Sequence, residues 1–189
     1  QGVRERIELA ADCEITLEAN PGSAEASRFA GFAEAGVNRP SLGVQSFQQA
    51  QLEALGRVHN ADQARAALEM AQGAGFASIN IDLMHGLPGQ APAAALADLE
   101  AALASGVPHL SWYQLTIEPN TAFYKRPPRL PDEDMLADIQ TLGELRVADA
   151  GFRNYEVSAY ARGHSQCRHN LNYWEFGDYI GIGAGAHGK

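Results

Sequence analysis

The chain has 189 residues, 46% of them hydrophobic, and its 23 acidic and 14 basic residues give a formal net charge of −9. This composition predicts a folded chain with one substantial core and excludes a disordered one. A nucleic-acid surface is disfavoured because phosphate binding depends on clustered Lys and Arg, which are scattered here. No apolar run approaches the roughly 20 residues that span a bilayer, and no signal segment opens the chain, so we expect a cytoplasmic protein.

Five apolar runs alternate with segments that read as helices. The runs are EITLEA (14–19), RPSLGVQSF (39–47), FASINIDLMHG (76–86), LSWYQLTIEP (110–119) and RNYEVSAYA (153–161). We expect helices at 3–10, 23–35, 48–55, 61–74, 91–105 and 132–150. Four of them end at a glycine that starts the next run, which is typical of a left-handed helix terminus: Gly36, Gly75, Gly106 and Gly151. The alternation predicts an α/β fold with a parallel sheet and right-handed crossovers.

Polar side chains follow one face of several predicted strands. In the third run Asn80 and Asp82 share one face, because side chains alternate across a strand, and apolar residues occupy the other. The same alternation in other runs selects Thr16, Glu18 and Asn20, then Gln114, Thr116 and Glu118, then Glu156 and Ser158. These groups lie toward the carboxyl ends of their strands, where sites form in parallel α/β proteins. The pattern therefore predicts a ligand cleft, although each group alone could instead bond to a loop backbone.

Two residues of this polar set, Glu18 and Asp82, together with Gln45 and Arg57 have chemistry suited to an amino acid joined to a ribose. Glu18 could receive an ammonium group, and Gln45 offers both a donor and an acceptor. Arg57 could clamp a carboxylate, the alternative being a solvated surface arginine. Asp82 lies in an apolar strand, where two ribose hydroxyls would satisfy it; the alternative is an arginine pair or a backbone cap.

Other ligand signatures are weak. There is no phosphate-binding GxxxxGK[ST] sequence, and GIGAGAHG (181–188) has too many glycines for a strict dinucleotide fingerprint. Cys13 and Cys167 lie far apart and form no CxxC pair, so we expect ordinary thiols.

Six ordered motifs resemble one known family. They are LEANPG (17–22), GVNRPSLGVQSF (36–47), LGRVHN (55–60), NIDLMHGLPGQ (80–90), WYQLTIEPNT (112–121) and HNLNYW…GDYIGIGAGAHG (169–188). Together they resemble the radical S-adenosylmethionine (SAM) family of oxygen-independent coproporphyrinogen III oxidases, and HNLNYW with GAHG is most similar to its haem-chaperone branch, the HemW-type proteins. The resemblance implies a partial TIM-type (β/α)6 barrel, of which residues 1–189 would be the central and C-terminal part of one domain, without its N-terminal strands and without a second domain.

The resemblance also implies cofactors. Glu18, Gln45, Arg57 and Asp82 fall on the positions that hold SAM in the family, and Thr116 falls where the family uses a main-chain contact. The family's CxxxCxxC motif and its Gly-Gly-Thr-Pro stretch are absent and would lie before Gln1. We therefore expect no ligand of the [4Fe-4S] cluster in this chain, no catalytic residue, and no radical activity from this chain alone.

The segment HNLNYW (169–174) is the predicted haem site. His169 could ligate the iron while Tyr173 and Trp174 flank the porphyrin, with Cys167 and His187 as weaker ligand candidates. The alternative is a buried histidine and aromatic side chains that pack the mouth of the barrel.

Two functions follow from the resemblance. The first is a haem chaperone that delivers haem to haem-requiring proteins, respiratory ones among them, with peripheral contact to membrane haem enzymes. The second is an enzyme that converts coproporphyrinogen III to protoporphyrinogen IX by radical decarboxylation. A metal-free aldolase-like barrel would need a lysine on a strand, and none of the runs carries one.

Overall fold

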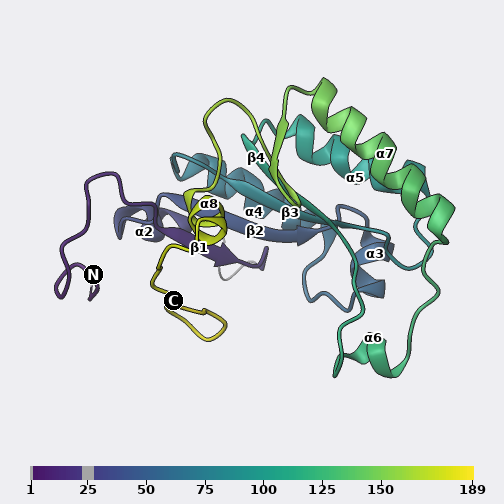
Figure 1. Cartoon of the computed structure of the whole chain (residues 1–189), viewed down its shortest axis with the longest axis horizontal. Coiled ribbons are helices and arrows are strands. Elements are labelled where there is room, and N and C mark those ends of the chain that lie inside the picture. Colours follow the sequence, from purple (N-terminus) through teal and green to yellow (C-terminus); the bar gives the residue numbers. More distant parts are fainter. Residues whose placement is uncertain (1, 23–27) are drawn as a thin grey trace.

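The computed structural model describes residues 2–22 and 28–189, in which helices and strands alternate along the chain (Figure 1). The strands are β1 (Thr16–Ala19), β2 (Arg39–Gln45), β3 (Asn80–His85), β4 (His109–Gln114), β5 (Arg153–Glu156) and β6 (Ala159–Ala161). The helices are α2 (Phe29–Glu34), α3 (Gln49–Ala54), α4 (Ala61–Gly73), α5 (Pro92–Ala104), α6 (Ala122–Lys125), α7 (Glu133–Asp149) and α8 (Arg168–Trp174).

The six strands form one sheet in the order β1-β2-β3-β4-β6-β5. β1 to β4 are parallel, and their crossovers contain the helices α2 to α5. The predicted α/β fold, a partial TIM-type barrel with a mostly parallel sheet, is therefore confirmed.

Local sequence signals place most helices correctly. The predicted helices at 48–55, 61–74, 91–105 and 132–150 match α3, α4, α5 and α7. Asn60 and Gln63 form a reciprocal capping box at the start of α4, as the sequence indicates. The glycines at two helix ends have positive φ angles, 77° at Gly75 and 78° at Gly106. Residues with a side chain rarely adopt this backbone conformation.

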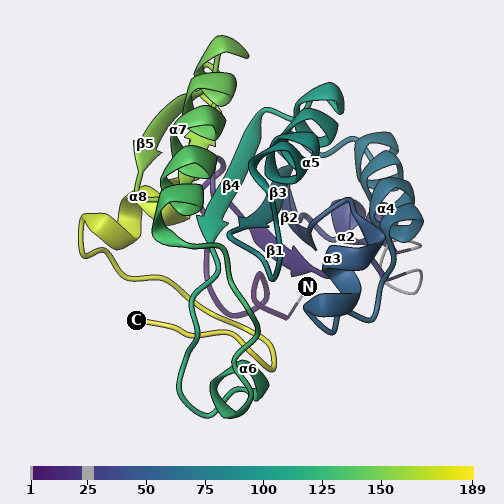
Figure 2. The same cartoon turned by 90° about the vertical axis from the view of Figure 1, so that its right-hand side faces the viewer.

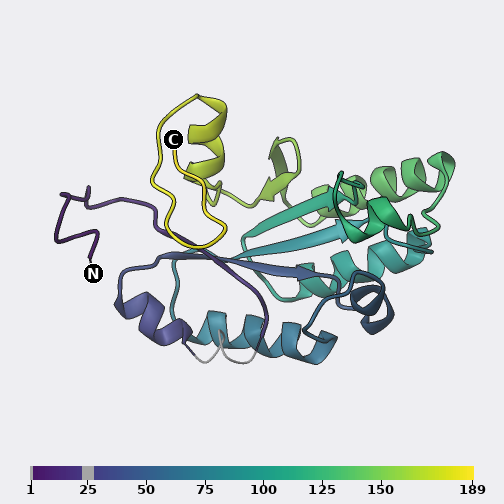
Figure 3. The ribbon, with the colours of Figure 1, turned by 90° about the horizontal axis from the view of Figure 1, so that it is seen from below.

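The outer face of the sheet carries the hydrophobic core. Alternate residues of β2, β3 and β4 are buried there, namely Leu42, Val44, Ile81, Leu83, Leu110 and Trp112. Helices α2, α4 and α5 cover this face, and α5 packs beside α7 (Figures 2 and 3). Gly143 of α7 lies against the indole of Trp112, so closely that a β-carbon at this position would overlap the ring. The apolar half of each strand is thus satisfied, and its polar half faces the other way.

Three details of the predicted fold are wrong. The last apolar run is not one parallel strand: it forms the hairpin β5–β6, and β6 pairs antiparallel with β4. The side chain of Asn154 closes the turn by donating to the carbonyls of Glu156 (2.7 Å) and Ala159 (3.2 Å). The opening segment 3–10 forms turns instead of a helix, and the two short helices α6 and α8 were not predicted. The predicted helix 23–35 is observed from Phe29, while residues 23–27 lie outside the described residues.

Candidate functional site

The inner face of the sheet is polar across all four parallel strands. Glu18, Ser41, Asn80 and His109 are successive register partners, so they form one row from β1 to β4. A cavity of about 150 Å³ lies over this row. Its lining residues are Thr16, Glu18, Arg39, Ser41, Asn80, Asp82, His109, Ser111, Cys167, His169 and Asn170. The polar cleft predicted from strand alternation therefore exists on β1 and β3, and Arg39 and Ser41 of β2 add to it.

Asp82 is held at the floor of this cavity by neutral donors. Ser41 donates to its Oδ2 (2.9 Å), and Asn80 donates to its Oδ1 (2.7 Å). Burial raises the pKa of Asp82, while hydrogen bonds from Ser41, Ser111 and Asn80 and the charge of Arg39 act in the opposite direction. Asp82 forms no ion pair with an arginine in the part of the chain that the structure describes, so the alternative of an arginine pair is wrong.

Glu18 lies at the mouth of the same cavity. Its side chain reaches solvent, yet partial burial raises its pKa, and the charge of Asp82 raises it further while Arg39 lowers it. Because burial and the charge of Asp82 both raise the pKa of Glu18, a ligand that brings a positive charge or hydroxyl donors would stabilise the ionised form of this carboxyl group.

Gln45 and Arg57 meet at the carboxyl ends of β1 and β2. Gln45 has a positive φ of 68°, and its Oε1 accepts a hydrogen bond from the hydroxyl of Tyr113 (2.7 Å). Arg57 donates through Nη2 to the side chain of Asn20 and to the carbonyl of Gly43 (3.2 Å). A β-carbon at Gly43 would lie 3.1 Å from Nε2 of Gln45 and 3.6 Å from Nη2 of Arg57, so the missing side chain keeps this cradle open.

Nε of Arg57 is buried and has no hydrogen-bond partner in the described structure. A buried guanidinium donor without an acceptor is costly, so the cradle fits an anionic ligand group such as a carboxylate. Arg57 is therefore not a solvated surface arginine. Arg57 and Gln45 thus offer hydrogen-bond donors beside Gly43, and Glu18 and Asp82 offer acceptors in the polar cavity.

β4 presents different residues to the cavity from those expected. Gln114 pairs with His85 and shares its parity with the buried Leu110 and Trp112, so its assignment to the polar inner face is wrong. Thr116 lies beyond the end of β4, is exposed, and donates to Glu118 (2.9 Å). Its side chain is thus directed to a neighbour in the same loop.

The inner residues of β4 were missed, although their odd-numbered alternation was visible in HLSWYQ (109–114). Nδ1 of His109 lies 2.6 Å from Oδ1 of Asn80, and its Nε2 lies 2.6 Å from the hydroxyl of Tyr155. Burial lowers the pKa of His109 to about 3, and the nearby Arg39 lowers it too. His109 is therefore a neutral link between the floor of the cavity and β5.

The predicted haem segment forms α8, which lies over the inner face of the sheet (Figure 3). His169 lines the polar cavity, and it also lines a second cavity of about 200 Å³ with Glu156, Asn170, Tyr173 and Trp174. Tyr173 is 54% exposed and Trp174 is 51% exposed, so these aromatic side chains do not pack a core. The alternative of a buried histidine and buried aromatic residues is wrong.

The two weaker ligand candidates differ in exposure. Cys167 is buried, its thiol contacts Glu14 (3.5 Å), and burial raises its pKa, all of which disfavour a thiolate ligand. His187 is exposed in the C-terminal segment. In the described part of the chain, no three His, Cys, Asp or Glu residues come together in a way that could hold a metal ion, so these residues do not fit a [4Fe-4S] cluster.

Residues 2–102 match the sequence profile of the Radical SAM superfamily. The chain belongs to the radical SAM superfamily. Proteins of this superfamily use SAM together with a [4Fe-4S] cluster. Among the described residues, no helix is both long enough and apolar enough to cross a membrane.

Two curated relatives match this radical SAM chain over nearly all its length. It is 59% identical over 188 residues to the heme chaperone HemW of Escherichia coli (strain K12), covering 100% of this chain and 50% of the relative. It is 54% identical over 187 residues to the heme chaperone HemW of Haemophilus influenzae, covering 99% of this chain and 49% of that relative. The similarity to HemW-type proteins predicted from six motifs is confirmed, and the chain spans about half the length of these relatives.

A solved structure matches the fold. Coproporphyrinogen III oxidase (HemN) from Escherichia coli superimposes with a TM-score of 0.82 at 25% identity, covering 98% of this chain and 46% of that one.

Proposed function

We infer that this chain is the SAM-binding and haem-holding part of a haem chaperone. The observation that carries the proposal is the position of His169, which lines both the polar cavity of the sheet and the cavity beneath Tyr173 and Trp174. The identity of 59% to the heme chaperone HemW of Escherichia coli supports the same function.

The polar cleft would bind SAM through four side chains. Arg57 and Gln45 would hold the carboxylate of the methionine part, because both present donors beside Gly43. Glu18 would receive the ammonium group or a hydroxyl, and Asp82 would accept from the ribose hydroxyls. A main-chain contact near Thr116 belongs to the same proposal. SAM supplies radical chemistry where a reduced [4Fe-4S] cluster is present, and the ligands of that cluster would come from outside residues 1–189.

The haem would lie along α8. An exposed imidazole at His169 can ligate iron, and Tyr173 and Trp174 offer aromatic surface to the porphyrin. Trp174 is already oriented, since its Nε1 donates to Glu156 (3.2 Å). The haem would pass from here to haem-requiring proteins, respiratory ones among them, in the cytoplasm or at the membrane surface.

A second candidate is oxidative decarboxylation of coproporphyrinogen III. The TM-score of 0.82 with the coproporphyrinogen III oxidase favours it, because a shared fold and a shared SAM face could serve either activity.

The test is a titration of haem into the intact protein, reconstituted with its cluster under anaerobic conditions, followed by addition of coproporphyrinogen III and SAM. Tight haem binding with unchanged porphyrinogen supports the chaperone, whereas formation of protoporphyrinogen assigns the oxidase activity. His169→Ala should shift or abolish the Soret band of bound haem. His164→Ala, which removes an exposed loop histidine, is the matched control.

A further inference from the structure

Helix α8 begins without a cap of its own. Its N-cap residue, Cys167, makes no capping hydrogen bond with its side chain, so the first backbone N–H groups of the helix need acceptors from elsewhere. α8 has seven residues, and a helix this short is marginal unless tertiary contacts hold it.

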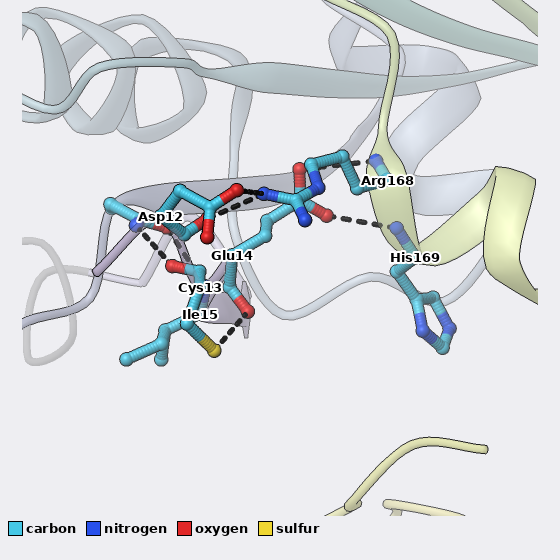
Figure 4. Close-up of polar contacts among 7 residues, drawn as sticks. Asp12, Cys13, Glu14, Ile15, Arg168 and His169 are labelled. Carbon is cyan, nitrogen blue, oxygen red and sulfur yellow. Dashed lines mark hydrogen bonds and ion pairs between the residues drawn. The ribbon is translucent and has the colours of Figure 1, made fainter. Parts of the chain in front are cut away.

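Glu14 supplies the missing acceptors from the other end of the chain. Its Oε2 accepts from the backbone N–H of Arg168 (3.1 Å), and its Oε1 accepts from the backbone N–H of His169 (3.0 Å), as Figure 4 shows. A carboxylate at this end of a helix is also favoured by the helix dipole. Residues 155 positions apart in the sequence are thereby joined.

The segment around Glu14 is itself fixed in place. Asn38, just before β2, accepts from the backbone N–H of Ile15 (2.8 Å) and donates to the carbonyl of Cys13 (2.9 Å). Arg168 adds a second tie by pairing through Nη1 with the carboxylate of Asp12 (3.0 Å; Figure 4). The carboxylate of Glu14 therefore reaches α8 from a backbone that is braced on both sides.

The contact acts directly on the proposed haem ligand. The backbone amide of His169 is one of the two groups that Glu14 binds, so the carboxylate restrains the backbone from which the imidazole extends. From that point the imidazole ring packs edge-on against Tyr179, with ring centroids 4.6 Å apart. The far end of α8 is held separately, by the hydrogen bond from Trp174 to Glu156.

We propose that Glu14 is a positioning residue that caps α8 and holds His169 in place to receive haem. The proposal rests on the proposed function, because it assigns a role to Glu14 through the haem ligand. It adds a residue from outside HNLNYW to the haem site, and it joins the segment before β1 to that site.

The experiment compares Glu14→Ala, Glu14→Gln and the matched control Glu8→Ala in the intact protein, since Glu8 is an exposed acid of the same segment. In Glu14→Ala we expect amide hydrogen exchange at Arg168 and His169 to become about tenfold faster, because charge-assisted hydrogen bonds are lost. We also expect weaker haem binding and a shifted Soret band. Glu14→Gln keeps one carbonyl acceptor, so its amide exchange and its haem binding should lie between those of wild type and Glu14→Ala.

Exchange at Ile81 and Leu110 reports whether each variant is folded, because both residues lie in the core. If Arg168 and His169 exchange in Glu14→Ala at the same rate as in Glu8→Ala, the proposal is overturned. It is also overturned if these amides exchange faster in Glu14→Ala while the Soret band and the haem affinity stay unchanged. A wild-type protein that binds no haem would refute the proposed function, while the exchange rates would still decide whether Glu14 caps α8.

Discussion

The hydroxyl of Tyr113 donates a 2.7 Å hydrogen bond to Oε1 of Gln45 and so determines which end of that amide faces the cleft. With Oε1 engaged, Nε2 remains to donate to a ligand beside Gly43 and Arg57. The positive φ of Gln45 costs conformational energy, which is typical of residues that a binding site holds in place.

Tyr113→Phe should therefore weaken SAM binding by about fivefold, since the loss of one hydrogen bond leaves the amide free to rotate. Isothermal titration calorimetry of the intact protein measures the change. Tyr124→Phe removes a hydroxyl from an exposed tyrosine and should leave the affinity as it is. Equal affinities for wild type and Tyr113→Phe would contradict the orienting role.

Asp82→Ala and Glu18→Ala should each reduce SAM affinity by about tenfold, because each removes a charged acceptor from the cleft. The same calorimetric titration applies. Asp138→Ala provides the control, since it removes an exposed carboxylate from α7. Unchanged affinity in both cleft variants would refute the proposed SAM site.

His109 should make the free energy of unfolding depend on pH. Its folded pKa is lowered to about 3 from 6.5, so the unfolded chain binds the proton first as the pH falls. The stability that His109 contributes is complete above pH 6.5 and is lost as the pH falls toward 3. At pH 5, which is about 1.5 units below the unfolded pKa of 6.5, the loss in the free energy of unfolding is up to about 2 kcal/mol.

Urea unfolding at pH 7 and pH 5 tests this prediction in wild type and in His109→Gln, which retains hydrogen-bonding groups but does not titrate. Between pH 7 and pH 5 the free energy of unfolding of wild type should fall by about 2 kcal/mol more than that of His109→Gln. Glu18 and Asp82 act in the opposite direction, because their raised pKa values favour the folded state at low pH, but both proteins contain them. An identical pH dependence in the two proteins would contradict the assignment.

Gly143→Ala should destabilise the protein by about 1–3 kcal/mol, because the added methyl group overlaps the ring of Trp112 and forces α7 away from the sheet. Gly31→Ala is the matched control in another helix, where a β-carbon meets no atom within 4 Å. It should be neutral or stabilising by up to about 1 kcal/mol. Thermal unfolding of both variants distinguishes a packing effect from a general effect of glycine in a helix.

The sequence by itself determined the features that depend on neighbouring residues. The capping box at Asn60, the glycines after four of the helices and the alternation in β3 are local signals, so they located most helices and the polar inner face. Glu18, Gln45, Arg57 and Asp82 were selected from local sequence context; Glu18 and Asp82 line the polar cavity, while Gln45 and Arg57 flank Gly43 at the end of β2.

Only the tertiary structure decided which of two possible faces or partners a segment uses. In β4 both alternations carry polar residues, and packing of Leu110 and Trp112 against the helices determined that His109, Ser111 and Tyr113 face the cleft. The hairpin β5–β6 pairs with β4 through contacts that form only in the folded sheet, and the contact between Glu14 and His169 joins residues 155 positions apart. Local propensity contains no information about such pairings, because their free energy arises only when the whole sheet is assembled.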